Sequence, residues 1–210
     1  MAWGFMPDIV AASWRRVYYR SAHYNKIYYD PLTDYMPPNN ADGQRAASAS
    51  YNTAIRGYFY APQYQQATNL ATDFTAIYDH YYRDSTPDLL GAEEAIYGCS
   101  VNAGGPCQPQ AAYYYQFKES LAACGSVAAQ QAIDANCYEK VVIDQADYSL
   151  TGGTNHFGRT LLEEQINFAN WYQFYAIRGD AGKTALMRAF TPDAVSSAIR
   201  IGRQSLNDDN

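Results

Sequence analysis

Residues 160–190 form the longest stretch of the chain in which apolar and polar positions repeat with the period of an α-helix. Apolar or small residues recur there at intervals of three, four or six, which places them on or near one face of a helix. The spacing therefore predicts one long helix over residues 160–190. The positions that define its face are Leu162, Ile166, Ala169, Tyr172, Ala176, Gly179, Ala185 and Ala189.

Both ends of this helix carry sequence signals. Thr160 and Glu163 have the spacing of a capping box, in which a hydroxyl and a carboxylate satisfy free backbone N–H groups of the first turn. Glu163 and Glu164 also place negative charge at the positive end of the helix dipole, so capping explains them before catalysis need be invoked. Pro192 ends the helix, because a proline disfavours helical geometry at the preceding residue.

The remaining pattern is weaker and predicts short elements. Residues 58–60 and 140–143 are rich in aromatic or β-branched side chains and predict strands, and residues 198–206 predict a final strand. Asn-Ala-Asp-Gly at residues 40–43 predicts a turn. The tyrosine-rich residues 111–123 are ambiguous between strand and helix by period alone.

Tyrosine dominates the composition. The 210 residues are 48% hydrophobic, and 21 of them are Tyr. A tyrosine buries its ring and keeps a polar tip, which suits an adhesive or carbohydrate-facing surface. The alternative, which the common use of amphipathic rings favours, is aromatic filling under long loops that have little aliphatic core. The candidate binding surface consists of Tyr28, Tyr29, Tyr35, Tyr58, Tyr60, Tyr113, Tyr114 and Tyr115.

The charge pattern argues against several classes of function. Charged residues make up 17% of the chain, and the formal net charge is −6. Nucleic-acid binding needs a basic surface, which the sequence does not provide. We therefore expect no nucleic-acid partner. No apolar run has the length of a membrane span, and residues 1–10 lack the pattern of a signal peptide.

The four cysteines, Cys99, Cys107, Cys124 and Cys137, all lie in the loop-rich middle of the chain. In an exported protein, an even number of cysteines in such a segment predicts two disulfides. Three pairings are possible, and we favour Cys99–Cys107 with Cys124–Cys137 because each closes a short loop. Zinc is the alternative, but the spacings of seven, sixteen and twelve intervening residues differ from those of paired zinc ligands.

The other polar residues predict no catalytic or metal site. His23, His80 and His156 are far apart, and none has a partner at a spacing typical of metal ligands. The side-chain oxygens of Asp34, Asn39 and Asn40 could bind calcium, but the EF-hand pattern is absent. We therefore expect a protein that is not an enzyme and has no cofactor of its own.

Residues 163–190 resemble the first long helix of the von Willebrand factor A (vWA)-like domain of the PilY family, which comprises type IV pilus assembly proteins and pilus-tip adhesins. The run Asn-Phe-Ala-Asn-Trp-Tyr at residues 167–172 is the most specific part of the resemblance. Residues 1–8 (MAWGFMPD), 28–38 (YYDPLTDYMPP) and 199–207 (IRIGRQSLN) resemble other parts of that region in the family order.

The resemblance implies an α/β fold, namely an incomplete vWA-like domain of the Rossmann type with one long helix. Residues 1–20 would begin the vWA-like region, and residues 159–210 would supply the long helix and the following strand. Residues 21–158 would form a large insertion, rich in tyrosine and loops, that carries the disulfides. An unstructured loop of that length would be improbable, so we expect the insertion to be structured.

The family's metal-binding motif, D-x-S-x-S, would end just before Met1. We therefore expect the chain to be a fragment without metal ligands of its own, whereas a longer parent would hold Mg²⁺ or Ca²⁺. The resemblance implies a non-catalytic module for type IV pilus biogenesis and surface adhesion. It also implies export to the periplasm, the outer membrane or the pilus tip. The expected partners are pilus components or minor pilins, with a host surface or a glycan as a further ligand.

Two alternatives stay open. A secreted glycan-binding or glycan-acting protein would also use an aromatic surface, and hydrolysis would require two carboxylates roughly 5–10 Å apart. The other alternative is a truncated chain that has no function alone. In that case the long helix would lack the sheet that it should cover, and its apolar face would be exposed.

Overall fold

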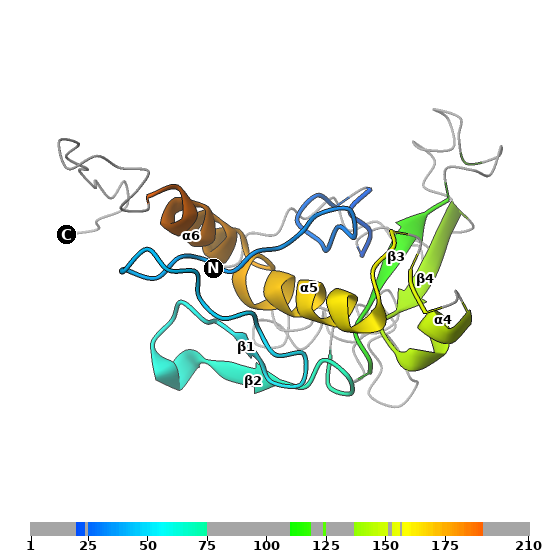
Figure 1. The fold of residues 1–210 in the computed structure, drawn as a ribbon, viewed down its shortest axis with the longest axis horizontal. Coiled ribbons are helices and arrows are strands. Elements are labelled where there is room, and N and C mark those ends of the chain that lie inside the picture. Colours follow the sequence, from blue (N-terminus) through cyan, green and yellow to red (C-terminus); the bar gives the residue numbers. More distant parts are fainter. Residues whose placement is uncertain are drawn as a thin grey trace, which may run out of the picture.

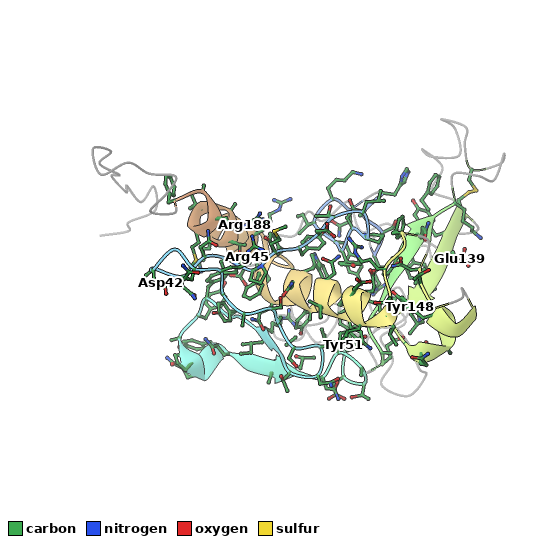
Figure 2. The ribbon with its side chains drawn as sticks, viewed as in Figure 1. Asp42, Arg45, Tyr51, Glu139, Tyr148 and Arg188 are labelled. Atoms are coloured by element: carbon green, nitrogen blue, oxygen red, sulfur yellow. A yellow bond between two sulfur atoms is a disulfide. The ribbon has the colours of Figure 1, made fainter. Side chains whose placement is uncertain are left out.

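The computed structural model describes residues 20–23, 25–74, 110–118, 124, 137–150, 153–155 and 157–190. Helix α5 (Leu161–Phe174) runs through the middle of this part, between one pair of strands, β1 and β2, and a second pair, β3 and β4 (Figure 1). The side chains of the described residues fill the space between α5 and the strands (Figure 2). The expected strand at residues 198–206 lies outside the described residues.

Helix α5 begins as the sequence predicts. The backbone N–H of Glu163 donates to Thr160 Oγ1 at 3.4 Å, and the N–H of Thr160 donates to Glu163 Oε2 at 2.8 Å. These two bonds are the two halves of a capping box. The prediction of the capping box is confirmed.

The prediction of one long helix is wrong, because a second helix, α6 (Arg178–Ala189), follows after a break. The carbonyl of Trp171 accepts from both Tyr175 N and Ala176 N, at 2.8 and 2.9 Å. Ile177 then adopts extended backbone angles, with φ −115° and ψ 135°. The regular hydrogen-bond ladder of an α-helix therefore stops before Ile177 and restarts beyond it.

Side-chain hydrogen bonds stabilise the corner between the two helices. The hydroxyl of Thr184 in α6 donates to the carbonyl of Phe174 at 2.9 Å, which satisfies an acceptor left free at the end of α5. Tyr175 donates from its hydroxyl to Met36 O at 2.6 Å and accepts from Arg188 Nη1 at 3.2 Å. Because the bond to Met36 joins residues far apart in sequence, the periodicity of residues 160–190 does not reveal the break.

The first pair of strands is a short antiparallel hairpin. β1 (Ala54–Arg56) pairs with β2 (Gln66–Thr68), and the 3₁₀ helix η1 (Pro62–Tyr64) lies in the connection. The prediction of a strand at residues 58–60 is wrong, because these residues lie in the turn after β1. Gly57 has a φ of +72°, a left-handed conformation that ends the strand and that glycine adopts without steric cost.

The second pair of strands contains most of the tyrosine run. β3 (Tyr113–Phe117) pairs with β4 (Tyr138–Val142) in antiparallel register, with Tyr113 opposite Val142 and Phe117 opposite Tyr138. The prediction of a strand near residues 140–143 is confirmed to within two residues. Helix α4 (Gln145–Leu150) follows β4.

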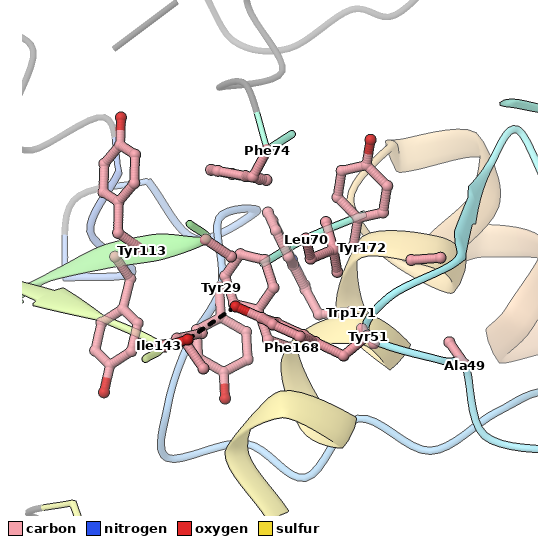
Figure 3. Packing of buried hydrophobic residues seen from close by; sticks show 14 of the residues in the cluster. Tyr29, Ala49, Tyr51, Leu70, Phe74, Tyr113, Ile143, Phe168, Trp171 and Tyr172 are labelled. Atoms are coloured by element: carbon pink, nitrogen blue, oxygen red, sulfur yellow. Dashed lines mark hydrogen bonds between the residues drawn. The ribbon is translucent and has the colours of Figure 1, made fainter. Parts of the chain in front are cut away.

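The core is mostly aromatic (Figure 3). Phe168 and Phe174 from α5 are fully buried, as are Phe74 and Leu70 from the middle of the chain. Residues of the predicted insertion and of the predicted long-helix region therefore share one core. The tyrosines buried in it are Tyr28, Tyr29, Tyr51, Tyr113, Tyr114 and Tyr172.

Both sheets in the described ranges are antiparallel and two-stranded. The incomplete vWA-like domain and the division at residues 20 and 158 stay predictions. Turn formation at residues 40–43 is confirmed, since Gly43 N donates to Asn40 O at 2.9 Å.

Candidate functional site

Four tyrosines of the predicted binding surface are buried, so their assignment to a surface is wrong. Tyr28, Tyr29, Tyr113 and Tyr114 expose 3%, 0%, 2% and 1% of their area. Their polar tips find partners inside the protein: the hydroxyl of Tyr28, for example, donates to Tyr113 O at 2.9 Å. With so little Leu, Ile and Val available, tyrosine rings supply the apolar volume of the core, as the alternative hypothesis expected.

The other tyrosines of that prediction differ in exposure. Tyr35, Tyr58 and Tyr115 are half-buried, whereas Tyr60 exposes 45% of its area. The Tyr35 hydroxyl accepts from Asp30 N at 3.0 Å, and burial raises its pKa to about 12. Only Tyr58 and Tyr60 of the eight lie in the loop between β1 and β2. A binding role for these two stays a prediction.

The buried side of α5 carries amides that hold the irregular segment before it. The side chain of Asn167 accepts from Tyr35 N at 2.8 Å and donates to Thr33 O at 2.9 Å. One turn further, Asn170 accepts from Ala49 N at 2.8 Å and donates to Tyr35 O at 2.9 Å. Because residues at i and i+3 share a helix face, the two amides form one ladder.

Gln173 extends this ladder to β1. Its side-chain oxygen accepts from Ile55 N at 2.8 Å, which satisfies a backbone donor on the outer edge of the strand. Trp171 holds another part of the same irregular segment, since its indole N–H donates to Ile27 O at 3.1 Å. We call Asn167, Asn170 and Gln173 the amide ladder. It supplies hydrogen bonds that irregular backbone cannot obtain from a sheet.

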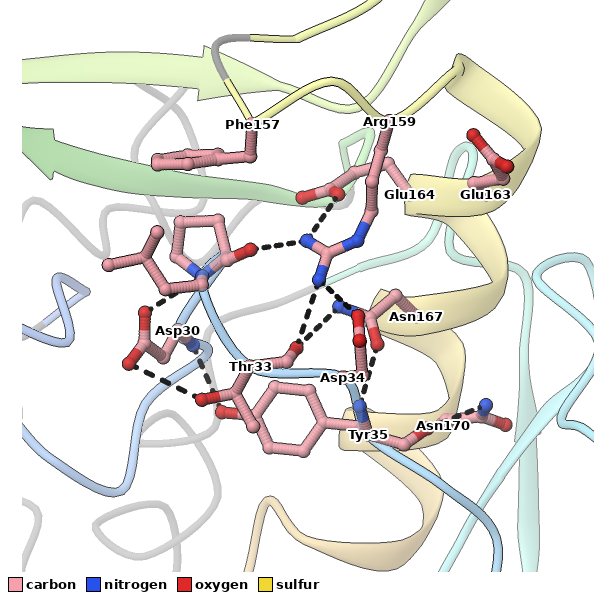
Figure 4. Close-up of polar contacts among 12 residues, drawn as sticks. Asp30, Thr33, Asp34, Tyr35, Phe157, Arg159, Glu163, Glu164, Asn167 and Asn170 are labelled. Carbon is pink, nitrogen blue, oxygen red and sulfur yellow. Dashed lines mark hydrogen bonds and ion pairs between the residues drawn. The ribbon is translucent and has the colours of Figure 1, made fainter.

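A buried carboxylate lies at the start of the same face (Figure 4). Glu164 is 0% exposed, accepts from the Tyr29 hydroxyl at 2.7 Å and pairs with Arg159 Nη1 at 3.2 Å. Arg159 also donates to the carbonyls of Pro31 and Thr33. The guanidinium therefore connects the first turn of α5 to the segment that the amide ladder holds.

Burial and the charge of Arg159 have opposite effects on the pKa of Glu164. Burial raises the pKa of Glu164, while the hydrogen bond from Tyr29 and the charge of Arg159 oppose that shift. The partner on the other side of Arg159 is Asp34, whose side chain is 76% exposed. Since the carboxylate of Glu164 is inaccessible to solvent and pairs with Arg159, it positions the first turn of α5 against the segment that contains Asp34.

An exposed aromatic surface lies at the other end of α5. We call residues 57–65, between β1 and β2, the aromatic loop. Tyr60 exposes 45% of its area and Tyr64 exposes 71%. Gln65 fixes the turn, because its side-chain amide donates to the carbonyls of Tyr58 and Tyr60, both at 3.1 Å. The exposed rings therefore stand on a loop of defined conformation.

The rings at the base of the aromatic loop connect it to the helix corner. The Tyr58 ring packs against Phe174 with centroids 4.9 Å apart, and Phe59 lies 6.4 Å from the same ring. From α6, Lys183 places its ammonium 5.5 Å from the Phe59 centroid and 4.8 Å from that of Tyr60. The aromatic loop and the first turns of α6 thus form one surface, which is the candidate functional site.

The structure contains a disulfide between Cys124 and Cys137, with Cα atoms 5.5 Å apart. It confirms one of the two predicted bridges. Tyr138 is buried beside it, and the half-buried Tyr115 packs against this small cluster. Cys99 and Cys107 lie outside the described residues.

In the described ranges, no three His, Cys, Asp or Glu side chains are grouped as a metal site would require. No helix within the same ranges has the length and apolar character needed to cross a membrane.

Sequence reasoning missed the roles of Glu164, Asn167 and Asn170. Glu164 was assigned to helix capping, but its carboxylate turns into the protein. A signal was present: two asparagines at i and i+3 are unusual inside an otherwise apolar helical stretch, because asparagine disfavours helix interiors. Both lie in the run at residues 167–172 on which the family resemblance chiefly rests.

No protein-family model matches the chain, and no solved structure matches it. Curated relatives do match. The chain is 25% identical over 213 residues to the type IV pilus biogenesis factor PilY1 of Pseudomonas aeruginosa strain PAO1, a match that covers 100% of the chain and 15% of the relative. The PilY1 of strain PAK is 28% identical over 215 residues, which cover 99% of the chain and 15% of the relative.

The PilY1 of strain UCBPP-PA14 is 27% identical over 193 residues, which cover 90% of the chain and 14% of that protein. The chain therefore spans about 15% of the length of these relatives. Similarity along nearly the whole chain supports a relationship to the PilY family.

Proposed function

We propose that this chain is a non-catalytic module of an exported protein that acts in type IV pilus biogenesis and surface adhesion. The observation that carries the proposal is the similarity along nearly the whole chain to three proteins named type IV pilus biogenesis factor PilY1. A disulfide between Cys124 and Cys137 is in keeping with export, since disulfides persist in oxidising compartments. Pilus components are the expected partners.

Within this module, α5 and its amide ladder hold the irregular segments, and the aromatic loop is the surface that meets a partner. Exposed tyrosines on a rigid loop suit recognition, because their large rings lose little conformational entropy on binding. Tyr60 and Tyr64 are therefore the proposed contact residues. Glu164 is not proposed as a catalytic residue, since its side chain is 0% exposed and a substrate could not reach its carboxylate.

The test uses the bacterium that encodes the chain. Deleting the gene should reduce the amount of pilin sheared from the cell surface, and restoring it should recover that amount. Replacing Tyr60 and Tyr64 together by Ser should lower attachment to a surface while the protein itself is still produced. Leu32→Ser is the matched control, because Leu32 is 74% exposed but lies outside the aromatic loop.

Two results would overturn the proposal. Unchanged surface pilin and unchanged attachment after deletion of the gene would remove the pilus role. Equal attachment by the tyrosine double variant and by the Leu32 control would remove the aromatic loop as the contact surface. Export has a separate readout: protein alkylated under non-reducing, denaturing conditions should show no label on Cys124 or Cys137.

A further inference from the structure

The candidate site holds an ammonium group over two aromatic rings. Lys183 Nζ lies 4.8 Å from the Tyr60 centroid and 5.5 Å from that of Phe59, both within the range of a cation–π contact. The Lys183 side chain is still 46% exposed. The position that its ammonium occupies is therefore within reach of groups outside the protein.

The carboxylate beneath this ammonium is incompletely paired. Asp180 is 2% exposed, and its Oδ1 makes no hydrogen bond. Its nearest cation is Lys183 Nζ at 3.9 Å, which is beyond hydrogen-bond distance. A buried polar atom without a hydrogen-bond partner is unfavourable, so a donor that reached Oδ1 would bind there favourably.

We propose that Asp180, Phe59 and Tyr60 form a binding site for a primary ammonium group of a partner, such as a lysine side chain, and that Lys183 occupies this site in the free protein. The inference rests on the aromatic loop as a contact surface, as described above. It adds the chemical class of the ligand and the residue that competes with it.

Charge and shape select this class of ligand. Two ring faces and a carboxylate all attract a cation, whereas an anion would meet the carboxylate of Asp180. A primary ammonium has three donors, so one can bond to Oδ1 while the group rests on the rings. Lys183 is tied to the backbone of α6 one turn after Asp180 and does not come within hydrogen-bond distance of Oδ1.

Lys183 also competes with any external amine. An ammonium on the same helix acts at a high effective concentration, which lowers the apparent affinity of a free ligand. Removing that ammonium should therefore expose the site and strengthen binding. The same change should leave the fold intact, because the Lys183 side chain is 46% exposed and its ammonium makes only a long contact of 3.9 Å with Asp180.

The experiment titrates the ¹⁵N-labelled full chain with n-butylammonium chloride, an analogue of the lysine side chain. Saturable shifts should appear at the amides of residues 57–60 and 179–184. Lys183→Ala should bind at least roughly tenfold more tightly than the natural sequence, since a cation–π contact and a charged hydrogen bond become available together. The double variant Asp180→Asn with Lys183→Ala should lose the binding, and n-butanol should bind to neither.

Three results would overturn the inference: a Lys183→Ala protein that melts like the natural one but shows no saturable shift, a double variant that binds as tightly as the single one, or equal binding of n-butanol. Failure of this titration would leave the pilus and attachment assays unaffected. A loss of attachment on substitution of Tyr60 and Tyr64, without ammonium binding, would therefore reject the ligand class and keep the contact surface.

Discussion

Helices α5 and α6 are neighbours in the chain, yet α5 buries far more of its side chains than α6 does. α5 buries Glu164, Asn167 and Gln173 along with its aromatic residues, while its first turns leave Leu162 65% exposed. The buried residues of the 12-residue α6 are Asp180 and Thr184, and its Leu186 is 57% exposed. In neither helix does apolar character alone decide which face is buried.

The difference follows from what lies against each helix. α5 packs against irregular segments whose N–H and C=O groups have no sheet partners, so amide and carboxylate side chains face inward and satisfy them. α6 buries only Asp180 and Thr184, and Thr184 bonds to Phe174 O at the helix corner. We therefore expect substitutions in α5 to destabilise the protein and matched substitutions in α6 to have little effect.

Replacing Trp171 should have the largest effect. Its side chain is 1% exposed and lies 5.0 Å from the rings of both Tyr28 and Phe168. Trp171→Ala should lower the free energy of unfolding by about 3–5 kcal/mol, because the site cannot refill a cavity of that size. Leu186→Ala in α6 is the control and should stay within about 0.5 kcal/mol. Urea denaturation measures both, and equal losses would contradict the contrast between the helices.

Removing one step of the amide ladder should cost less. Asn170→Ala leaves Ala49 N and Tyr35 O without their partner, and each buried group that stays unsatisfied costs about 1–3 kcal/mol. We expect the free energy of unfolding to fall by about 2–3 kcal/mol, and the amide hydrogen of Ala49 to exchange faster with solvent than in the natural protein. Lys183→Ala in α6 should change stability by less than about 1 kcal/mol. Unaltered exchange at Ala49 would show that the amide does not hold this segment.

The pH dependence of stability should separate buried from exposed carboxylates. Burial raises the pKa of Glu164 above its ordinary 4.5 and that of Asp180 above 3.8, so the folded state binds their protons more tightly than the unfolded state. Protonation of these carboxyl groups therefore stabilises the folded state. This stabilisation is complete when the pH is below the ordinary pKa values, and it is lost as the pH rises through the raised pKa values. Glu164→Gln should therefore reduce the change in the free energy of unfolding with pH just above pH 4.5.

Glu163 should show the opposite sign. The bonds from Thr160 lower its pKa below 4.5, so its contribution is present above that value and is lost as pH falls through the lowered pKa. Urea midpoints of Glu163→Gln and Glu164→Gln, measured from pH 3 to pH 8, test both signs. Parallel curves for the two variants would contradict the different surroundings of the two glutamates.

Two glycines should respond in opposite directions by small amounts. A Cβ at Gly182 in α6 would meet nothing within 4 Å, so Gly182→Ala should stabilise the protein by about 0.5–1 kcal/mol. At Gly57, with φ +72°, a Cβ would lie 3.1 Å from Tyr60 Cδ2 and from Tyr64 O. Gly57→Ala should destabilise by about 1–2 kcal/mol. Thermal melting compares the two, and stabilisation at both sites would show that the aromatic loop tolerates rearrangement.

Local signals predicted the features that depend on neighbouring residues. The capping box at Thr160, the turn ending at Gly43 and the disulfide between Cys124 and Cys137 each involve groups close in sequence. The strand near residues 140–143 was also predictable, because β-branched and aromatic residues fit a pleated surface.

The site was less predictable, because its contacts join segments far apart. Tyr58 and Tyr60 belonged to the predicted surface, but the sequence did not distinguish them from Tyr29 and Tyr114, which the core encloses. Lys183 and Asp180 looked like ordinary helix residues. Their relation to the aromatic loop depends on the corner between α5 and α6, which the bond from Thr184 to Phe174 O and the long-range bond from Tyr175 to Met36 O stabilise.

The amino-acid order alone was enough to predict the start of α5 and to indicate a similarity to type IV pilus biogenesis factors, since a capping box and a sequence resemblance are both read directly along the chain. Folding in three dimensions settled which tyrosines are buried, where the long helix breaks and why Glu164 faces inward. The physical reason is that a side chain's burial and hydrogen bonds are set by whatever segment packs against it. For α5, that segment lies more than one hundred residues away in the sequence.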